Sequence, residues 1–161
     1  MKRLTEKVFK KGCFIPTDVT GDYDFRVRYR DNWLWGSGDP GIPVIAYGIH
    51  TISVDPVTGK IINFEGYESH EYWEESSREL PPVSKQTLFF DPVPQSWQSG
   101  VGIDLRLHEP GNEGGTFYNR ADKLLIMGKR HKGPVYRIGG NLYVHVKKGR
   151  VNTIYITGVE S

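Results

Sequence analysis

The chain has 161 residues, a length typical of one domain that buries its own core. Apolar residues make up 37% of it, aromatic residues 12% and charged residues 25%, a composition that excludes an intrinsically disordered chain. A single cysteine excludes an intramolecular disulfide, and with it the disulfide-rich class of secreted proteins.

Turn-forming residues favour a sheet protein. Nineteen glycines and ten prolines imply many tight connections, which a helical bundle tolerates poorly. No internal repeat is evident, so we predict one β-rich domain over residues 1–161. The expected fold class is mainly β, an antiparallel sandwich or a curved, partly closed sheet with two or three short helices and six to eight strands.

The N-terminus carries charge throughout and lacks the apolar stretch of a signal peptide. No apolar run approaches the roughly 20 residues of a membrane span. We therefore expect a cytoplasmic protein with no membrane partner.

The first elements along the chain are a helix and a strand. Residues 2–11 place Leu4 and Val8 on one helical face and predict a short helix. Residues 24–30 alternate between apolar side chains and arginines, the period of a half-buried strand.

A glycine-rich loop, residues 36–41, follows Trp33 and Trp35. It lacks the Lys-Ser/Thr of a phosphate-binding P-loop, and we interpret it as a turn. The two tryptophans are candidate anchors for a protein partner, since tryptophan is enriched at interface hot spots, with burial in the core as the alternative.

The middle of the chain predicts a hairpin and two ambiguous segments. Residues 43–54 and 60–67 flank a turn at residues 55–59, although the run from Ile45 to Val54 keeps no single apolar face, which suggests burial on both sides or a bulge. Residues 70–79 suggest a short acidic helix. Residues 101–107 alternate like a strand, and residues 119–127 fit a helix or, at 124–127, a strand.

The C-terminal thirty residues give the strongest β pattern, with strands expected at 136–138, 142–147 and 151–157. A two-residue turn would force Lys148 to positive φ, so we expect a three-residue turn of Lys147, Lys148 and Gly149. That register places Leu142, Val144, Ile154 and Ile156 on one face, and Tyr143, His145, Val151, Thr153 and Tyr155 on the other.

Charge is unevenly distributed along the chain. From Lys123 onward there are eight Lys or Arg and one acid, a charge of +7, whereas the first 122 residues carry −5. Nucleic-acid phosphates are one partner for this basic region; the alternative is that it faces the acidic segment 65–79. The candidate binding residues there are Lys129, Arg130, Lys132, Arg137, Tyr143, Lys147, Lys148 and Arg150.

The five histidines show no spacing typical of a metal site, and no motif indicates a cofactor, so neither is expected. His131, His145, Arg130 and Arg137 do supply the residue types of metal-independent RNA cleavage: a general base, a general acid and cations. This makes a ribonuclease-like enzyme one hypothesis.

Three functions therefore remain open. We favour a non-enzymatic protein that binds a protein partner, of the inhibitor or immunity type, because no motif indicates chemistry. A nucleic-acid-binding domain that uses the basic C-terminal sheet is the second hypothesis, and the ribonuclease-like enzyme is the third.

Overall fold

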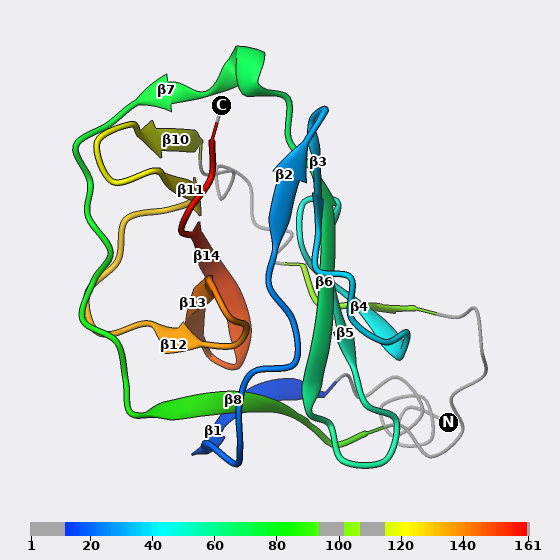
Figure 1. Ribbon diagram of the computed structural model, residues 1–161. Coiled ribbons are helices and arrows are strands. Elements are labelled where there is room, and N and C mark those ends of the chain that lie inside the picture. Colours follow the sequence, from blue (N-terminus) through cyan, green and yellow to red (C-terminus); the bar gives the residue numbers. More distant parts are fainter. Residues whose placement is uncertain (1–11, 94–101, 107–114, 161) are drawn as a thin grey trace, which may run out of the picture.

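The computed structural model describes residues 12–93, 102–106 and 115–160. Within these ranges the regular structure consists of strands and one 3₁₀ turn, so the predicted mainly β fold is confirmed. The described residues form fourteen strands, several of only two or three residues, where six to eight were expected. The strands form two six-stranded sheets, neither of them closed, and one two-stranded ribbon (Figure 1). Most neighbouring strands are antiparallel, but each large sheet also has one short parallel pair.

We call the first large sheet the N-terminal sheet. Its strands, in hydrogen-bonded order, are β2 (Arg28–Arg30), β3 (Trp33–Trp35), β6 (Ile61–Tyr67), β5 (His50–Val54), β4 (Ile42–Tyr47) and β9 (Ile103–Asp104). The predicted turn between β5 and β6 is present. One Asp55 carboxylate oxygen accepts hydrogen bonds from the amides of Val57 and Thr58, and Gly59 takes the positive φ of 75° that closes the turn.

The second large sheet is the C-terminal sheet. Its strands, in the same kind of order, are β12 (Tyr136–Arg137), β13 (Leu142–Lys147), β14 (Arg150–Ile156), β11 (Leu124–Gly128), β10 (Thr116–Asn119) and β7 (Glu74–Glu75). The ribbon pairs β1 (Cys13–Asp18) with β8 (Gln86–Asp91). In Figure 1 this ribbon runs across one end of the two sheets.

The two large sheets repeat one topology. Five strands of each follow the same order, β2-β3-β6-β5-β4 in the first and β10-β11-β14-β13-β12 in the second. Each also has a β-bulge at the same step before its last hairpin turn, between Ser53 and Val54 in one and between His145 and Val146 in the other. The expectation of no repeat was therefore wrong for the fold.

The two sheets also have a tyrosine at the same position, with the same hydrogen bond. Tyr29 pairs with Leu34 across the first hairpin, and Tyr118 pairs with Leu125 across its counterpart. Tyr29 donates its hydroxyl to the carbonyl of Glu68, and Tyr118 donates to that of Val159, so each hydroxyl fixes the chain just after the last strand of its repeat. The repeat is not evident in the sequence because the two halves share few other identical residues.

A single hydrophobic cluster lies between the sheets. Residues of both large sheets and of the ribbon contribute to it, including Leu34, Ile52, Phe64, Phe90, Leu142, Val144 and Ile154. A second, smaller cluster covers the other face of the C-terminal sheet, formed by Leu124, Ile126, Val135 and Tyr155 with Leu80, Phe117 and Tyr143 packed against it. The C-terminal sheet is therefore covered on both faces where β11 and β14 run.

The predicted short helices are not borne out. Residues 70–79 form only the 3₁₀ turn η1 (His70–Tyr72) before β7. The Trp73 ring lies between those of Tyr29 and Tyr118, with centroids 4.9 and 5.2 Å away, and this packing holds the segment extended. The helix expected at residues 2–11 lies outside the described residues.

Of the two alternatives for residues 119–127, the structure has the strand at 124–127 and not the helix. Residues 119–127 contain the end of β10 and the strand β11, whose five residues are all buried and so lack any periodicity that distinguishes strand from helix. Residues 43–54 are not one strand but the hairpin β4–β5, which reverses at Gly48 and Ile49. The hairpin also has a β-bulge between Ile45 and Tyr47, one of the two explanations expected for the mixed pattern of this run.

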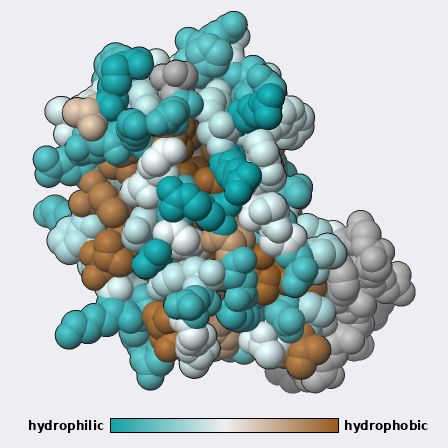
Figure 2. Space-filling model, viewed as in Figure 1, coloured by the Kyte–Doolittle hydropathy of each residue, from teal (hydrophilic) through white to brown (hydrophobic). Residues whose placement is uncertain are grey.

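The surface in the view of Figure 2 shows several small hydrophobic patches separated by hydrophilic residues rather than one continuous apolar face. No helix in the described parts of the chain is long and apolar enough to cross a membrane.

Candidate functional site

The hairpin β13–β14 positions the candidate site. Its pairing sets Tyr143 opposite Tyr155 and His145 opposite Thr153 on the face away from the main core, as predicted. The turn differs from the prediction, because β13 ends at Lys147 and β14 begins at Arg150, which leaves two residues, with Lys148 at a φ of 53°.

The β-bulge reconciles this two-residue turn with the predicted faces. Beyond His145, the next paired residues are Val146 and Val151, so Asn152 is an extra residue on β14. The bulge places Val151 in the main core instead of on the outer face, where it was expected, and leaves His145 and Tyr143 with their predicted neighbours.

Two histidines far apart in sequence meet at the end of this hairpin. The rings of His131 and His145 are stacked, with centroids 3.7 Å apart and planes 11° from parallel. His145 comes from β13, whereas His131 comes from the loop after β11. The sequence predicted both residues as candidates, and the fold brings them together.

A chain of hydrogen bonds fixes the tautomer of His145. The Thr153 hydroxyl donates to the Lys129 carbonyl at 2.6 Å, so the Thr153 oxygen accepts from the Asn152 amide nitrogen, 3.1 Å away. The same amide nitrogen lies 3.2 Å from Nδ1 of His145, which must therefore accept. The proton of neutral His145 is then on Nε2.

A second chain orients His131. Its Nε2 lies 2.7 Å from the Tyr155 hydroxyl, and its Nδ1 lies 3.4 Å from the carbonyl of Lys132. Arg78 also hydrogen-bonds the Tyr155 side chain, and a guanidinium can only donate, so the phenol is free to donate its proton to His131. In this arrangement the acceptor nitrogen of each imidazole is already engaged.

Both imidazoles are neutral near pH 7. Burial lowers the pKa of His131, and it lowers the pKa of His145 to about 4, an effect to which the neighbouring His131 and Lys147 add. Burial raises the pKa of the Tyr155 hydroxyl, and the Arg78 and Arg130 guanidiniums oppose that rise. A bound anion would raise the pKa of both histidines again, since a nearby negative charge favours the protonated ring.

The surrounding cations are not neutralised by the acidic segment. Of the eight C-terminal cations, Lys123 alone forms an ion pair with a described residue, and its partner is Glu160. The acidic segment does join the same sheet through β7, but there Glu75 pairs with Arg120. Exposed and without an ion pair in the described structure are Arg130, Lys132, Lys147 and Lys148.

Three other predicted binding residues have structural roles. The Arg137 guanidinium donates to the carbonyls of Gly139 and Gly140 and lies 4.5 Å from the centre of the Tyr23 ring, so its hydrogen bonds hold its own loop. Tyr143 packs against the smaller core cluster. Arg150 is partly buried, and its guanidinium is 3.5 Å from the Arg106 carbonyl.

Trp33 and Trp35 lie on the other sheet, away from the histidines. Trp33 is 57% exposed and packs edge-on against Tyr67, with ring centroids 5.2 Å apart, whereas Trp35 is partly buried. These two strands, β3 and β6, thus present an aromatic pair to solvent. In the neighbouring β2–β3 hairpin, the side-chain oxygen of Asn32 lies 3.1 Å from the Tyr29 hydroxyl.

Sequence reasoning missed several members of the site. Arg78 comes from a segment predicted as an acidic helix, and Asn152 and Thr153 gave no signal by residue type. The roles of Asn152 and Thr153 depend on the bulge in β14, which no local sequence pattern predicts. In the described parts of the chain, no three His, Cys, Asp or Glu side chains gather as metal ligands would.

Comparisons with known proteins add no assignment. No protein-family model matches the chain, and neither a curated protein nor a solved structure does.

Proposed function

We propose that the end of the β13–β14 hairpin binds the phosphate backbone of a single-stranded nucleic acid. The observation that carries the proposal is the stacked pair of His131 and His145 beside cations that have no ion pair in the described structure. His145 also hydrogen-bonds the Lys132 backbone, and the exposed Arg130, Lys132 and Lys147 supply the charge for a phosphate. Phosphate contacts of this kind supply most non-specific affinity for nucleic acid.

The hydrogen bonds favour binding over cleavage. A general base needs a free acceptor nitrogen within reach of the proton that it removes. Nδ1 of His145 already accepts from Asn152, and Nε2 of His131 is engaged with Tyr155. We therefore prefer the nucleic-acid-binding hypothesis to the ribonuclease-like one.

A charge-reversal experiment tests this function. The double variant Arg130→Glu with Lys147→Glu should weaken binding of a fluorescein-labelled single-stranded RNA about tenfold or more at roughly 0.1 M salt. The slope of log affinity against log salt should become shallower by about 0.7 for each phosphate that the variant no longer neutralises. The measurement is fluorescence anisotropy over a salt series.

Arg28 provides the matched control, because it is an exposed cation on β2 of the other sheet. Arg28→Glu with Arg30→Glu changes the net charge equally and should leave the affinity within about twofold. Equal losses in both double variants would mean that only overall charge matters, and no binding at low salt would refute the function. Cleavage of the RNA in EDTA, lost in His145→Ala, would restore the ribonuclease hypothesis.

Proton uptake gives a second test of the same site. A bound phosphate raises the pKa of His145 above its value of about 4 in the unbound protein, and protonation of Nδ1 then replaces its hydrogen bond from Asn152. Binding therefore takes up a proton, and the affinity should rise as the pH falls from about 7 to 5. His145→Gln keeps a donor but cannot be protonated. Its affinity should be nearly independent of pH over this range, and a slope as steep as that of the wild type would exclude His145 from the site.

A second candidate function rests on the aromatic pair. Trp33 and Tyr67 are exposed side by side on the neighbouring strands β3 and β6, and rigid aromatic side chains are typical anchors of protein interfaces. The favoured sequence hypothesis, a protein partner, is therefore proposed for this surface. Trp33→Ala should abolish co-purification of such a partner while leaving RNA affinity unchanged.

A further inference from the structure

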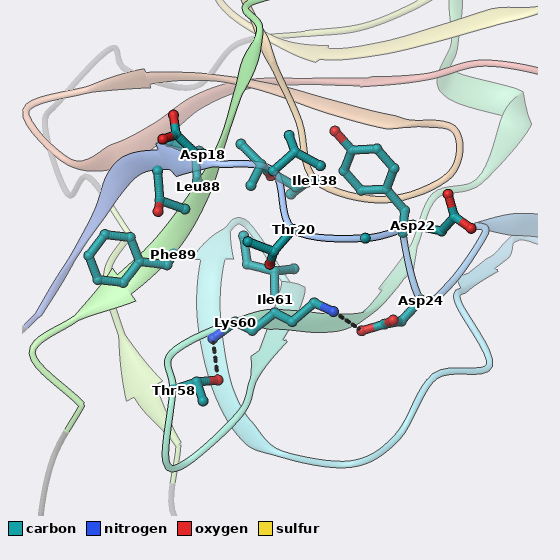
Figure 3. A pocket seen from close by; sticks show the side chains of 15 residues that line it. Asp18, Thr20, Asp22, Asp24, Thr58, Lys60, Ile61, Leu88, Phe89 and Ile138 are labelled. Atoms are coloured by element: carbon teal, nitrogen blue, oxygen red, sulfur yellow. Dashed lines mark hydrogen bonds and ion pairs between the residues drawn. The ribbon is translucent and has the colours of Figure 1, made fainter.

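A pocket lies where the ribbon meets the N-terminal sheet, away from the histidine pair. It has a volume of about 420 Å³, within the range of sites for small molecules. Four parts of the chain form it: the end of β1 with the following loop, the β5–β6 turn with the start of β6, the strand β8, and Ile138 in the loop after β12. Figure 3 shows Phe89, Ile61 and Ile138 around this space.

The walls of the pocket are apolar and belong to the core. Ile61, Leu88 and Ile138 are 5%, 2% and 2% exposed, and all three are among the residues that line the space. Because they are anchored in the main cluster, the walls are held in place before any ligand arrives. Phe89, which also lines the space, remains partly exposed, so a ligand with an apolar body would gain chiefly by covering its ring.

The rim of the pocket carries an excess of negative charge. Asp18, Asp22 and Asp24 line it against one lysine, Lys60. Lys60 pairs with Asp24 at 2.8 Å along one edge, as Figure 3 shows. Asp18 has a 3.5 Å contact with the side-chain amide of Gln86, and among the residues that the structure describes neither Asp18 nor Asp22 forms an ion pair.

Hydroxyl groups complete the lining and limit what fits. Thr17, Thr20, Thr58 and Thr87 all contribute to it, although Thr87 already donates its hydroxyl to the Arg137 carbonyl. A carboxylate or phosphate would meet the repulsion of the aspartates at the rim. A cationic group would be attracted to them and could still reach hydroxyl oxygens.

From this combination we infer that the pocket is a binding site for small organic amines with an apolar, ring-sized body. The apolar walls of Ile61, Leu88, Phe89 and Ile138 take the body, and the rim of Asp18 and Asp22 takes the ammonium group. The site is independent of the nucleic-acid surface proposed above.

A matched pair of probes tests the inference. Phenethylamine and 3-phenylpropionate have the same ring and similar length but opposite charge. In a ¹⁵N–¹H titration, phenethylamine should shift the amides of Thr20, Tyr23, Thr58 and Ile61 in a saturable way. Phenylpropionate should bind at least about tenfold more weakly, given the sign of the rim.

Variants separate the roles of wall and rim. The double variant Asp18→Asn with Asp22→Asn should weaken the binding of phenethylamine about fivefold or more. It should also reduce the difference in affinity between phenethylamine and phenylpropionate. Thr20→Trp, at an exposed position of the lining, should fill the space and remove binding of both. Asp39→Asn, an exposed aspartate outside the pocket, is the control that should change nothing.

The inference is overturned if phenethylamine causes no saturable shift, or if the two probes bind equally well to the wild type. Retained affinity in Thr20→Trp would place the amine elsewhere on the molecule. Each of these outcomes leaves the RNA measurements unaffected, because the pocket and the histidine pair share no residue.

Discussion

At the scale of single residues, His50 and Glu68 form a buried acid–base pair. Nε2 of His50 lies 3.3 Å from a Glu68 carboxylate oxygen, and Nδ1 lies 3.0 Å from the Tyr47 carbonyl. The Nδ1 proton is donated to that carbonyl, so Nε2 carries the lone pair, and it is buried without a hydrogen-bond partner in the described structure. Burial lowers the pKa of His50 to about 4 and raises the pKa of Glu68, so the pair favours neutral forms.

These two shifts act in opposite directions on stability. A neutral buried His50 binds fewer protons than in the unfolded chain between pH 6.5 and about 4, so its contribution to stability is lost as the pH falls. Glu68, with its raised pKa, binds more protons when folded, so its contribution is lost as the pH rises. In the wild type the two slopes partly cancel.

Glu68→Gln should expose the contribution of His50. In this variant the free energy of unfolding should fall as the pH is lowered from 6.5 to 4, because the unfolded chain takes up a proton on His50. The fall should be about 3 kcal/mol larger than in the double variant Glu68→Gln with His50→Gln, which lacks the titrating imidazole. Urea unfolding at several pH values measures the difference. Equal pH slopes in the two variants would show that His50 is protonated as easily when folded as when unfolded.

At the scale of elements, the β13–β14 turn carries a conformational strain. Lys148 and Gly149 have φ of 53° and 77°, the signs of a type I′ turn, and lysine rarely adopts the first of these. The β2–β3 hairpin uses Asp31 and Asn32 at φ of 52° and 69°, residues that tolerate this conformation better. The turn lies against β1, and the Phe14 amide of β1 donates a hydrogen bond to the Gly149 carbonyl.

Lys148→Asn should therefore stabilise the protein by about 0.5–1 kcal/mol, because asparagine adopts positive φ at lower cost. Lys147→Asn is the matched control: it removes the same side chain from an extended position and should give no gain. Thermal unfolding of the three proteins measures the effect. A gain in both variants would attribute it to reduced charge repulsion rather than to the turn.

Elements formed by local patterns along the chain were predicted from the sequence, whereas contacts between distant segments were not. The alternation of β13 and β14 correctly predicted which side chains share a face, with the exception of Val151, because one face of each strand lies in the main core. It misassigned Val151 and the turn, because a bulge in one strand can offset a shorter turn and both solutions fit the same pattern. The stacked histidines were predicted by type but not by contact, since the loop that carries His131 is placed by tertiary packing.

At the scale of the whole molecule, the segment between the two repeats ties the sheets together. It contributes β7 to the C-terminal sheet, β8 to the ribbon and β9 to the N-terminal sheet. Neither sheet is complete without a strand from this segment, and both share the main core. We expect the chain to unfold as one unit, in keeping with the prediction of a single domain.

Equivalent core positions test this cooperativity. Phe64 and Ile154 occupy the same place in the two repeats, opposite Ile52 and Val144. Phe64→Leu or Ile154→Val should lower the free energy of hydrogen exchange by about 1 kcal/mol in β5 and β13 alike, whichever sheet carries the substitution. A loss confined to the substituted sheet would show two independently unfolding units.

The repeated topology also gives the molecule an internal reference. Register places Ser53 where the other repeat has His145, and Glu65 where it has Tyr155. Properties that come from the backbone arrangement alone are present twice, whereas a property found in one repeat only must come from side chains that the other lacks. Each half of the chain is thus a natural negative control for the site carried by the other, with the same strands, the same bulge and different chemistry.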